Sequence, residues 1–480
     1  MILEDFEKQL KSGDTVAKLR AGLIGERAEI DGPLGRRQLI YADYTASGRA
    51  LQQVEDFIAR QVLPFYANSH TQSSFCGAFT TDLREQARAL IAAHTNAGDD
   101  CSVIFSGSGA TSAINRLVGL CGISDLCQRE TEPAAWLKKL FGQKSDENQR
   151  PLVLVGPYEH HSNLLPWRES RAEVIEISEA TDGGPDLALL EQTLKNCHDR
   201  PLVIGAFSAA SNVTGIVTDV NAVTRLLKRY GALAFWDYAG GGPYLPIDMN
   251  PGPGLEKDAV YLSPHKFPGG PGASGLLIVR NNVVQIERPT APGGGSVSYV
   301  SSWAHDYLDS IIEREEAGTP NVIGDIRAAL VFIIKEAVGT EFIRQRDEEL
   351  VSRAFSVWSK NPNIDILAPS IRQRLPIFSF TMHDGEKATI HHEKVTRLLS
   401  DIYGIQARGG CACAGPYGHR LLGVERQLSE EIRHAVASGK ETEKPGWTRL
   451  NLGYLMDDDT ANFIIQSVDD LARGAIEQRQ

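Results

Sequence analysis

Short runs of apolar residues alternate with helix-like patterns across the middle of the chain. Strands are expected at residues 151–156, 172–177, 201–208, 232–237, 259–262 and 275–279. Apolar positions recur at helical spacing over residues 187–195 and 221–230. The run Leu152-Val153-Leu154-Val155 contains no polar residue, which is typical of a strand buried on both faces of a sheet. The alternation therefore predicts an α/β fold with a mostly parallel sheet between helices.

The pattern changes near residue 320. Long helices are expected at residues 321–338 and 341–360, a strand at 376–382, and further helices at 392–403 and 460–479. A polar stretch, residues 130–150, is expected to be a helix-containing excursion at the surface. We therefore predict an N-terminal helical segment (residues 1–30), a large domain (31–320) and a smaller C-terminal α+β domain (321–480).

Composition narrows the class of protein. The chain has 480 residues and a formal net charge of −12, whereas a nucleic-acid-binding protein normally carries a basic patch. The acidic first residues lack the pattern of a secretory signal, and the longest apolar run, residues 328–334, is too short to span a membrane. Seven cysteines, unevenly placed, do not suggest a disulfide framework. We expect a soluble cytoplasmic protein that binds neither nucleic acid nor membrane.

A lysine among glycines and prolines is the first candidate for chemistry. Lys266 lies in Ser263-Pro264-His265-Lys266-Phe267-Pro268-Gly269-Gly270, between two expected strands. A lysine at a strand end can form a Schiff base with a carbonyl compound, although many such turns contain only a solvated lysine. Asp237 ends an earlier strand, where it could face the ring nitrogen of pyridoxal 5'-phosphate (PLP) or simply begin the glycine-rich turn that follows.

Two further segments suit the same cofactor. Ser106-Gly107-Ser108-Gly109-Ala110-Thr111-Ser112 precedes a helical pattern, and such a turn presents free N–H groups to a phosphate. His160 and His161 follow the strand at 151–156, where an aromatic ring could stack on a cofactor. Each signal alone is weak, because serine-rich helix caps and surface histidines are common.

Taken in order, these motifs resemble the class V aminotransferase superfamily of fold-type I PLP enzymes, and within it the cysteine desulfurase/selenocysteine lyase branch. The resemblance spans residues 41–455 and implies a seven-stranded sheet in the large, PLP-binding domain. It implies that Lys266 forms the Schiff base with PLP. Ser263, His265 and Thr111 are then expected to bind the phosphate.

The same resemblance gives roles to four more residues. It implies that Asp237 faces the pyridine nitrogen and that His160 stacks on the ring and takes part in catalysis. Asn212, in Ser211-Asn212-Val213-Thr214-Gly215, is expected to contact the phenolic oxygen of the cofactor or the substrate. Thr319 lies in a segment whose threonine reaches a phosphate across a dimer interface, so a homodimer is implied.

A loop with two cysteines is the candidate site for a reaction at sulfur. The segment Ala407-Arg408-Gly409-Gly410-Cys411-Ala412-Cys413-Ala414-Gly415-Pro416 is similar to the Arg-x-Gly-x-x-Cys-Ala-x-Pro loop of the family. The match places Cys413 as the nucleophile and Arg408 beside the cofactor or substrate. Arg449, in Thr448-Arg449-Leu450-Asn451-Leu452, resembles the arginine that holds the substrate carboxylate. The implied reaction takes sulfur from L-cysteine as an enzyme persulfide, releases L-alanine and passes the sulfur to an acceptor protein.

Three departures from the family pattern leave alternatives open. Gly240 stands where many desulfurases have a glutamine, Cys411 is an extra cysteine, and residues 415–447 form a long insertion with an expected helix at 430–438. Cys411 would face the same way as Cys413 in an extended chain, which would allow sulfur exchange; together with His419 the two could instead bind a metal, although no fourth ligand is evident. The alternative activities are selenocysteine lyase, a cysteine C–S lyase, an epimerase or an aminotransferase, and a noncatalytic sulfur carrier or scaffold is a remote further alternative.

Overall fold

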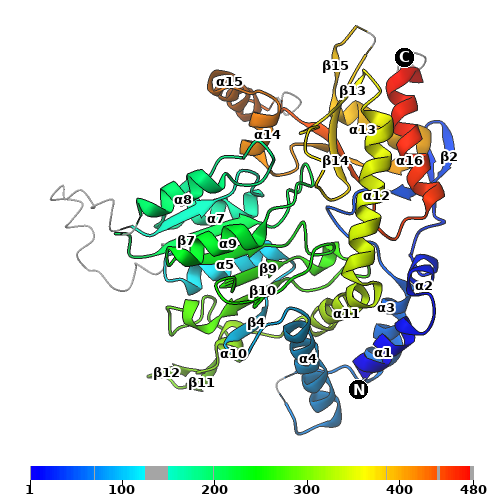
Figure 1. The fold of residues 1–480 in the computed structure, drawn as a ribbon. Coiled ribbons are helices and arrows are strands. Elements are labelled where there is room, and N and C mark those ends of the chain that lie inside the picture. Colours follow the sequence, from blue (N-terminus) through cyan, green and yellow to red (C-terminus); the bar gives the residue numbers. More distant parts are fainter. Residues whose placement is uncertain are drawn as a thin grey trace.

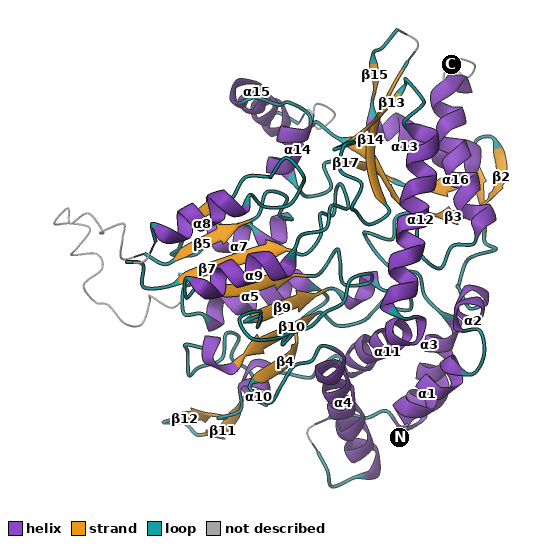
Figure 2. Ribbon diagram, viewed as in Figure 1, coloured by secondary structure: helices purple, strands orange, loops and turns teal. Residues whose placement is uncertain are grey.

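A seven-stranded sheet forms the centre of the large domain in the computed structural model (Figures 1 and 2). The structure describes residues 2–69, 71–124, 150–197, 199–384, 386–439 and 444–475, so the excursion expected at 130–150 lies almost entirely outside the described residues. The strand order is β4-β10-β9-β8-β7-β5-β6. The strands are β4 (Cys101–Phe105), β5 (Leu152–Val155), β6 (Glu173–Glu176), β7 (Val203–Ser208), β8 (Leu233–Asp237), β9 (Ala259–Leu262) and β10 (Leu276–Arg280).

All six expected strands are confirmed, and the prediction missed β4. Neighbours from β6 to β9 pair in parallel, whereas β10 runs antiparallel to both β9 and β4. The sheet is thus mostly parallel with a mixed edge, and the carboxyl ends of its parallel strands meet on one side.

Helices cover both faces of this sheet. Leu152 and Leu154 of β5 pack in a core with α8 (Leu187–Lys195), α9 (Val220–Arg229) and α11 (Val322–Val338). Val153 and Val155 pack on the other face with α5 (Ala110–Leu120) and α7 (Leu165–Arg168). The uninterrupted apolar run of β5 follows from this burial on both sides.

The smaller domain contains a second sheet. Its strand order is β13-β14-β18-β17, with β15 beside β14. The strands are β13 (Ile364–Ile366), β14 (Ile377–His383), β15 (Thr389–Ile390), β17 (Arg408–Gly410) and β18 (Trp447–Asn451). They pack against α12 (Thr340–Trp358), α13 (His392–Tyr403) and α16 (Asp458–Asp470), at the upper right of Figure 1.

The helices expected in this part are present, with one difference in length. The pattern predicted a helix over 460–479, but the α-helix begins after Asp457, whose carboxylate accepts a hydrogen bond from Thr460 N. It ends at Asp470, and a π-helical turn (Leu471–Ala475) follows, within which Gly474 has a φ of 155°.

The N-terminal part of the chain contacts both domains. It contains α1 (Ile2–Lys11), α2 (Thr15–Ala21), β1 (Glu29–Gly32), β2 (Gly35–Gln38), β3 (Ile40–Tyr41), α3 (Gln52–Phe57) and α4 (Phe75–His94). Helices α1 to α3 share an apolar core with α11. Strand β3 pairs in parallel with β16 (Ile405–Gln406) and thereby joins the segment after β3 to the smaller domain.

Two features project from the body. A hairpin of β11 (Val297–Val300) and β12 (His305–Tyr307) precedes α10 (Ile311–Glu315) and exposes 91% of Trp303. The insertion after the cysteine loop forms α14 (Gly415–Leu421) and α15 (Arg426–Ala437), so the helix expected at 430–438 is present but begins earlier.

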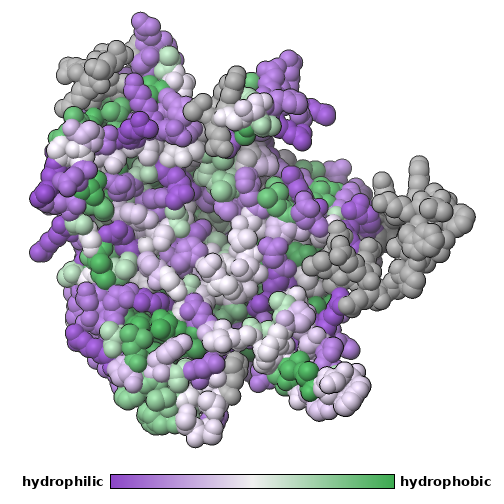
Figure 3. Space-filling model, turned by 180° about the vertical axis from the view of Figure 1, so that it is seen from behind, coloured by the Kyte–Doolittle hydropathy of each residue, from purple (hydrophilic) through white to green (hydrophobic). Residues whose placement is uncertain are grey.

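Hydrophobic groups are scattered among hydrophilic ones on the face turned away in Figure 1 (Figure 3). None of the described helices is long and apolar enough to cross a membrane.

Candidate active site

A cavity of about 340 Å³ lies at the carboxyl ends of the parallel strands. Asp237 ends β8, Ser208 ends β7, and Lys266 follows β9. This edge is where sheets of this type bind ligands. Every predicted site residue except Thr319 lines the cavity: Thr111, His160, Asn212, Asp237, Ser263, His265, Lys266, Arg408, Cys413 and Arg449.

Lys266 and Asp237 both line the cavity, and their opposite charges influence each other. Lys266 ends the short helical turn Pro264–Lys266, and burial lowers the pKa of its amine to about 8, although the nearby Asp237 opposes this shift. The Asp237 side chain is buried, which raises the pKa of its carboxyl group, while Ala239 N donates a hydrogen bond of 2.7 Å to Oδ1. An amine with this pKa can bind and release a proton near neutral pH.

His160 is an uncharged ring beside this pair. Burial lowers the pKa of His160 to about 3, and the charge on Lys266 shifts it in the same direction. Its Nδ1 accepts a hydrogen bond of 3.1 Å from Ser162 N, which fixes the ring at the start of a short helical turn. A neutral aromatic ring bordering the cavity can stack on a planar ligand.

The beginning of α5 forms a polar cradle at one end of the cavity. Ala110 N donates to Ser263 Oγ at 3.0 Å, and Thr111 Oγ1 and Ser162 Oγ are 2.7 Å apart. His265 Nδ1 lies 2.8 Å from Ser108 O. Hydroxyl groups around a helix N-terminus are suited to an anion such as a phosphate.

One buried polar atom indicates a ligand at the opposite side. Asn212 Nδ2 donates to Ala412 O at 2.8 Å, but its buried Oδ1 has no hydrogen-bond partner within the described residues. A buried acceptor without a partner costs free energy unless a ligand or water supplies a donor. A ligand with a hydroxyl group near Asn212 and an anionic group near α5 would satisfy both ends of the cavity.

The cysteine loop is a tight turn. Ala414 N donates to Cys411 O at 3.1 Å, and Ala412 and Cys413 have φ angles of 50° and 55°. Two successive positive φ angles characterise a type I′ turn, which costs free energy in residues other than glycine. His161 N donates to Cys413 O at 2.8 Å and holds the turn against the cavity. Cys411 and Cys413 therefore do not lie in an extended chain, the condition under which their side chains would face the same way.

The two thiols have different surroundings. Cys413 is exposed and lines the cavity, whereas the half-buried Cys411 packs against the apolar cluster that contains Tyr158, Tyr417 and Trp447. No group of three or more His, Cys, Asp or Glu side chains among the described residues is arranged to bind a metal.

An aspartate that was not predicted from the sequence, Asp43, joins the two predicted arginines. Asp43 Oδ1 accepts from Arg449 Nη2 at 3.0 Å, and Asp43 Oδ2 accepts from Arg408 Nε at 2.9 Å. Arg449 is buried and also donates to Asn212 O at 3.0 Å. Burial lowers the pKa of Arg449, and Asp43 opposes this shift. Asp43 therefore orients both guanidinium groups at the cavity and offsets one of their charges.

Ser208 and Gly240 also line the cavity without having been predicted to bind a ligand. The position of Ser208 at the end of a predicted strand was the signal that could have identified it. Asp43 offered no such signal, because its partners are far away in the sequence.

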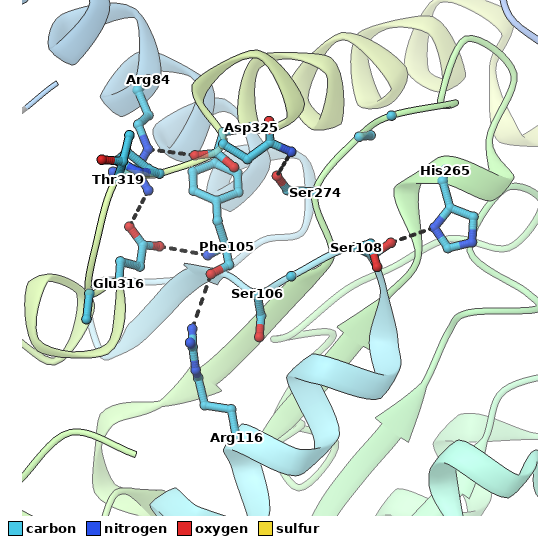
Figure 4. A pocket seen from close by; sticks show the side chains of 16 residues that line it. Arg84, Phe105, Ser106, Ser108, Arg116, His265, Ser274, Glu316, Thr319 and Asp325 are labelled. Atoms are coloured by element: carbon cyan, nitrogen blue, oxygen red, sulfur yellow. Dashed lines mark hydrogen bonds and ion pairs between the residues drawn. The ribbon is translucent and has the colours of Figure 1, made fainter. Parts of the chain in front are cut away.

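Thr319 lies in a second cavity, of about 680 Å³ (Figure 4). Arg84 donates to Glu316 and Asp325 there, and Glu316 also accepts from Phe105 N. Ser108 and His265 border both cavities, so Thr319 is on the far side of the polar cradle from Lys266. Within one chain Thr319 therefore shares a cavity with His265 but with none of the other predicted site residues.

The fold places this chain among fold-type I proteins. The apo cysteine desulfurase of Thermococcus onnurineus NA1 superposes with a TM-score of 0.71 at 22% identity, covering 91% of this chain and 95% of that chain. The cysteine desulfurase CsdA of Escherichia coli superposes with a TM-score of 0.67 at 21% identity, covering 95% and 98%. At these identities the likeness establishes the fold alone.

The sequence comparison identifies the family. The family model for class-V aminotransferases matches residues 141–438, more than half of the chain, and the chain belongs to this family. A probable cysteine desulfurase of Pyrococcus abyssi is 28% identical over 409 residues, covering 83% of this chain and 90% of that protein. A probable cysteine desulfurase of Staphylococcus aureus is 25% identical over 391 residues, covering 81% and 86%.

Proposed function

We propose that this protein is a PLP-dependent cysteine desulfurase, which takes sulfur from L-cysteine as a persulfide on Cys413 and releases L-alanine. The observation that carries the proposal is a thiol, Cys413, in the same cavity as Lys266, Asp237 and two arginines. The names of the relatives from Pyrococcus abyssi and Staphylococcus aureus support the same activity.

The cavity fits PLP at both of its ends. Thr111, Ser263 and His265 would hold the phosphate at the start of α5, and Asp237 would hold the protonated ring nitrogen. His160 would cover one face of the ring, and the unpaired Asn212 Oδ1 would accept a hydrogen bond from the cofactor or substrate. Bound through Lys266, PLP would supply an electron sink that makes the substrate α-proton acidic.

The arginines select the substrate. Arg449 is fixed by Asp43 and Asn212, and a guanidinium group binds a carboxylate through two parallel hydrogen bonds. Asp43 offsets one of the two arginine charges, so the remaining positive charge suits a substrate with a single α-carboxylate. The more exposed Arg408 lies at the same side of the cavity.

Lys266 and Cys413 then act on opposite ends of the substrate. The Lys266 amine takes the α-proton of the bound cysteine, a transfer favoured by a pKa of about 8. The Cys413 thiolate attacks the substrate sulfur, so that an S–S bond forms while the Cβ–S bond breaks. The carbon left behind gains a proton, alanine leaves, and Cys413 carries the sulfur as a persulfide.

Two further observations support a homodimer and a cytoplasmic location. The cavity around Thr319 shares Ser108 and His265 with the cavity that contains Lys266, so a second subunit could complete the phosphate site in a homodimer. The six described cysteines are free thiols, as expected in the reducing cytoplasm. The sulfur acceptor would be a protein that reaches the exposed Cys413.

Incubation of the PLP-loaded protein with L-cysteine and a reductant tests the function. We expect alanine and sulfide in equal amounts, and a Cys413→Ser variant should keep the visible absorption of bound PLP while it loses alanine formation. A Lys266→Ala variant should lose both the covalently bound cofactor and the activity. Pyruvate and ammonia in place of alanine would indicate a C–S lyase and would refute the assignment.

A further inference from the structure

Cys411 lies next to the proposed nucleophile but outside its cavity. Among the described residues that line the cavity, Cys413 is the only cysteine. The half-buried Cys411 packs instead against the apolar cluster that contains Tyr417 and Trp447, and Leu421, the last residue of α14, packs against the same cluster. A thiol in this place cannot attack the bound substrate directly, and the mechanism above does not use it.

The turn nevertheless keeps the backbone of the two cysteines close together. Residues two apart in a chain have Cα atoms separated by at most about 7 Å, and a turn brings them closer. Disulfides form between residues whose Cα atoms are about 4.4–6.8 Å apart. The hydrogen bond from Ala414 N to Cys411 O closes the turn, and His161 N and Asn212 Nδ2 hold its middle carbonyl groups in place. The spacing of the two Cα atoms therefore falls in the range at which the sulfur atoms of two cysteines can meet.

We propose that Cys411 is a second sulfur-carrying site, which accepts the persulfide sulfur from Cys413 and holds it outside the cofactor cavity; the proposal rests on the proposed desulfurase function. The Cys411 thiolate attacks the outer sulfur of the Cys413 persulfide. A new S–S bond forms at Cys411, the S–S bond at Cys413 breaks, and the proton lost by Cys411 returns to Cys413. The transfer moves one sulfur atom and needs no external oxidant or reductant.

Transfer would change the stoichiometry of the reaction. Once its sulfur has moved to Cys411, Cys413 is again a free thiol in the cavity and can attack a second cysteine. In the absence of any acceptor or reductant, each subunit would therefore release about two molecules of alanine in the initial burst, because two thiols can hold sulfur. An enzyme with Cys413 alone would stop at about one.

The experiment counts alanine per subunit in the PLP-loaded protein after it is mixed with excess L-cysteine, followed by alkylation and tandem mass spectrometry of the peptide that contains both cysteines. We expect a burst of about two in the wild type and about one in Cys411→Ser and Cys411→Ala. In the wild type the additional sulfur should be found on Cys411 as well as on Cys413. The matched control is Cys197→Ser, which alters another half-buried thiol packed against an apolar core and should behave as the wild type.

The outcomes separate the two proposals. A burst of about one in the wild type, with sulfur found only on Cys413, would overturn the role of Cys411 and leave the desulfurase function intact. A disulfide between the two cysteines with release of sulfide would also overturn it, because Cys411 would then discharge the sulfur rather than hold it. No alanine in any variant would refute the desulfurase function itself. Using both serine and alanine at position 411 guards against a packing defect in either variant.

Discussion

Substitution of Asp43 tests how the two arginines are held at the cavity. Asp43 is the one carboxylate that joins Arg408 and Arg449 among the described residues, with contacts of 2.9 and 3.0 Å. The side chains of Asp43 and Arg449 are 12% and 6% exposed, whereas that of Arg408 is 53% exposed. Loss of Asp43 therefore leaves Arg449 buried without its counter-charge, while Arg408 can turn to solvent.

The expected changes in stability and in kcat/KM follow from this difference in burial between Arg449 and Arg408. Removing one partner of a buried ion pair costs about 3–5 kcal/mol, because the other charge stays buried, so Asp43→Ala should lower the free energy of unfolding by about that amount. Asp43→Asn removes the negative charge that holds the buried Arg449, and its single amide oxygen can accept from only one of the two guanidinium groups. Loss of a hydrogen bond to a charged group costs about 1.5–3 kcal/mol, which corresponds to about a 10- to 150-fold reduction in kcat/KM for cysteine.

Urea denaturation and steady-state kinetics measure the two effects. Because Asp43 acts through the arginine that binds the carboxylate, KM for L-cysteine should rise more than kcat falls, and the absorption of bound PLP should stay unchanged. The matched control is Asp365→Asn, which removes a carboxylate paired with His383 but is 71% exposed and should change neither quantity measurably. Unchanged KM and an unchanged denaturation midpoint in Asp43→Asn would refute the reasoning.

Three further substitutions test other parts of the structure. Ala412→Gly should raise the free energy of unfolding by about 1 kcal/mol in a urea titration, because glycine adopts the φ of 50° without steric cost; a decrease would contradict the strained turn. Burial raises the pKa of Glu159 from 4.5 to about 7, so the folded chain keeps a proton that the unfolded chain has lost between these values. Its stabilising contribution is complete below pH 4.5 and is lost as pH rises through 7, and urea titrations across this range should show that Glu159→Gln removes this dependence; equal pH profiles would refute it. Glu316→Ala should cost about 3–5 kcal/mol in the same assay, because Arg84 and Arg88 would keep buried charges, and a loss below about 1 kcal/mol would contradict the buried network.

The central sheet could be predicted because its strands are buried on both faces. In β5 the consecutive residues Leu152 and Val153 pack in different cores, on opposite faces of the sheet. The strand must therefore be apolar at every position. β4 was missed because it begins with Cys101 and Ser102, and its first residue is only half-buried. Its place in the sheet depends on pairing with β10, which is far away along the chain, and the local pattern of residues does not indicate that partner.

The residues of the candidate site also differ in whether the local sequence could predict their positions. The places of Asp237, Lys266 and Thr111 at the cavity were predictable because Asp237 ends a strand, Lys266 lies four residues after one, and Thr111 lies at the beginning of a helix, where local sequence determines the geometry. The backbone between Cys411 and Cys413 could not be predicted, because it depends on the conformation of Ala412, and alanine gives no signal for a positive φ. Tertiary contacts, including the hydrogen bond from Asn212 to Ala412 O, hold that conformation.

Asp43 illustrates why motif spacing alone could not describe the substrate side of the site. Its carboxylate reaches Arg408 and Arg449 because β3 pairs with β16 and Asn451 N donates to Ala42 O at 2.8 Å, which places an N-terminal segment inside the C-terminal domain. Two arginines read from the sequence suggest a site with two positive charges, suited to a dicarboxylate. With Asp43 between them the site keeps about one net charge, which favours a substrate with a single carboxylate, such as cysteine. The long-range pairing of the short strand β3 therefore determines the net charge of the arginines at the substrate site.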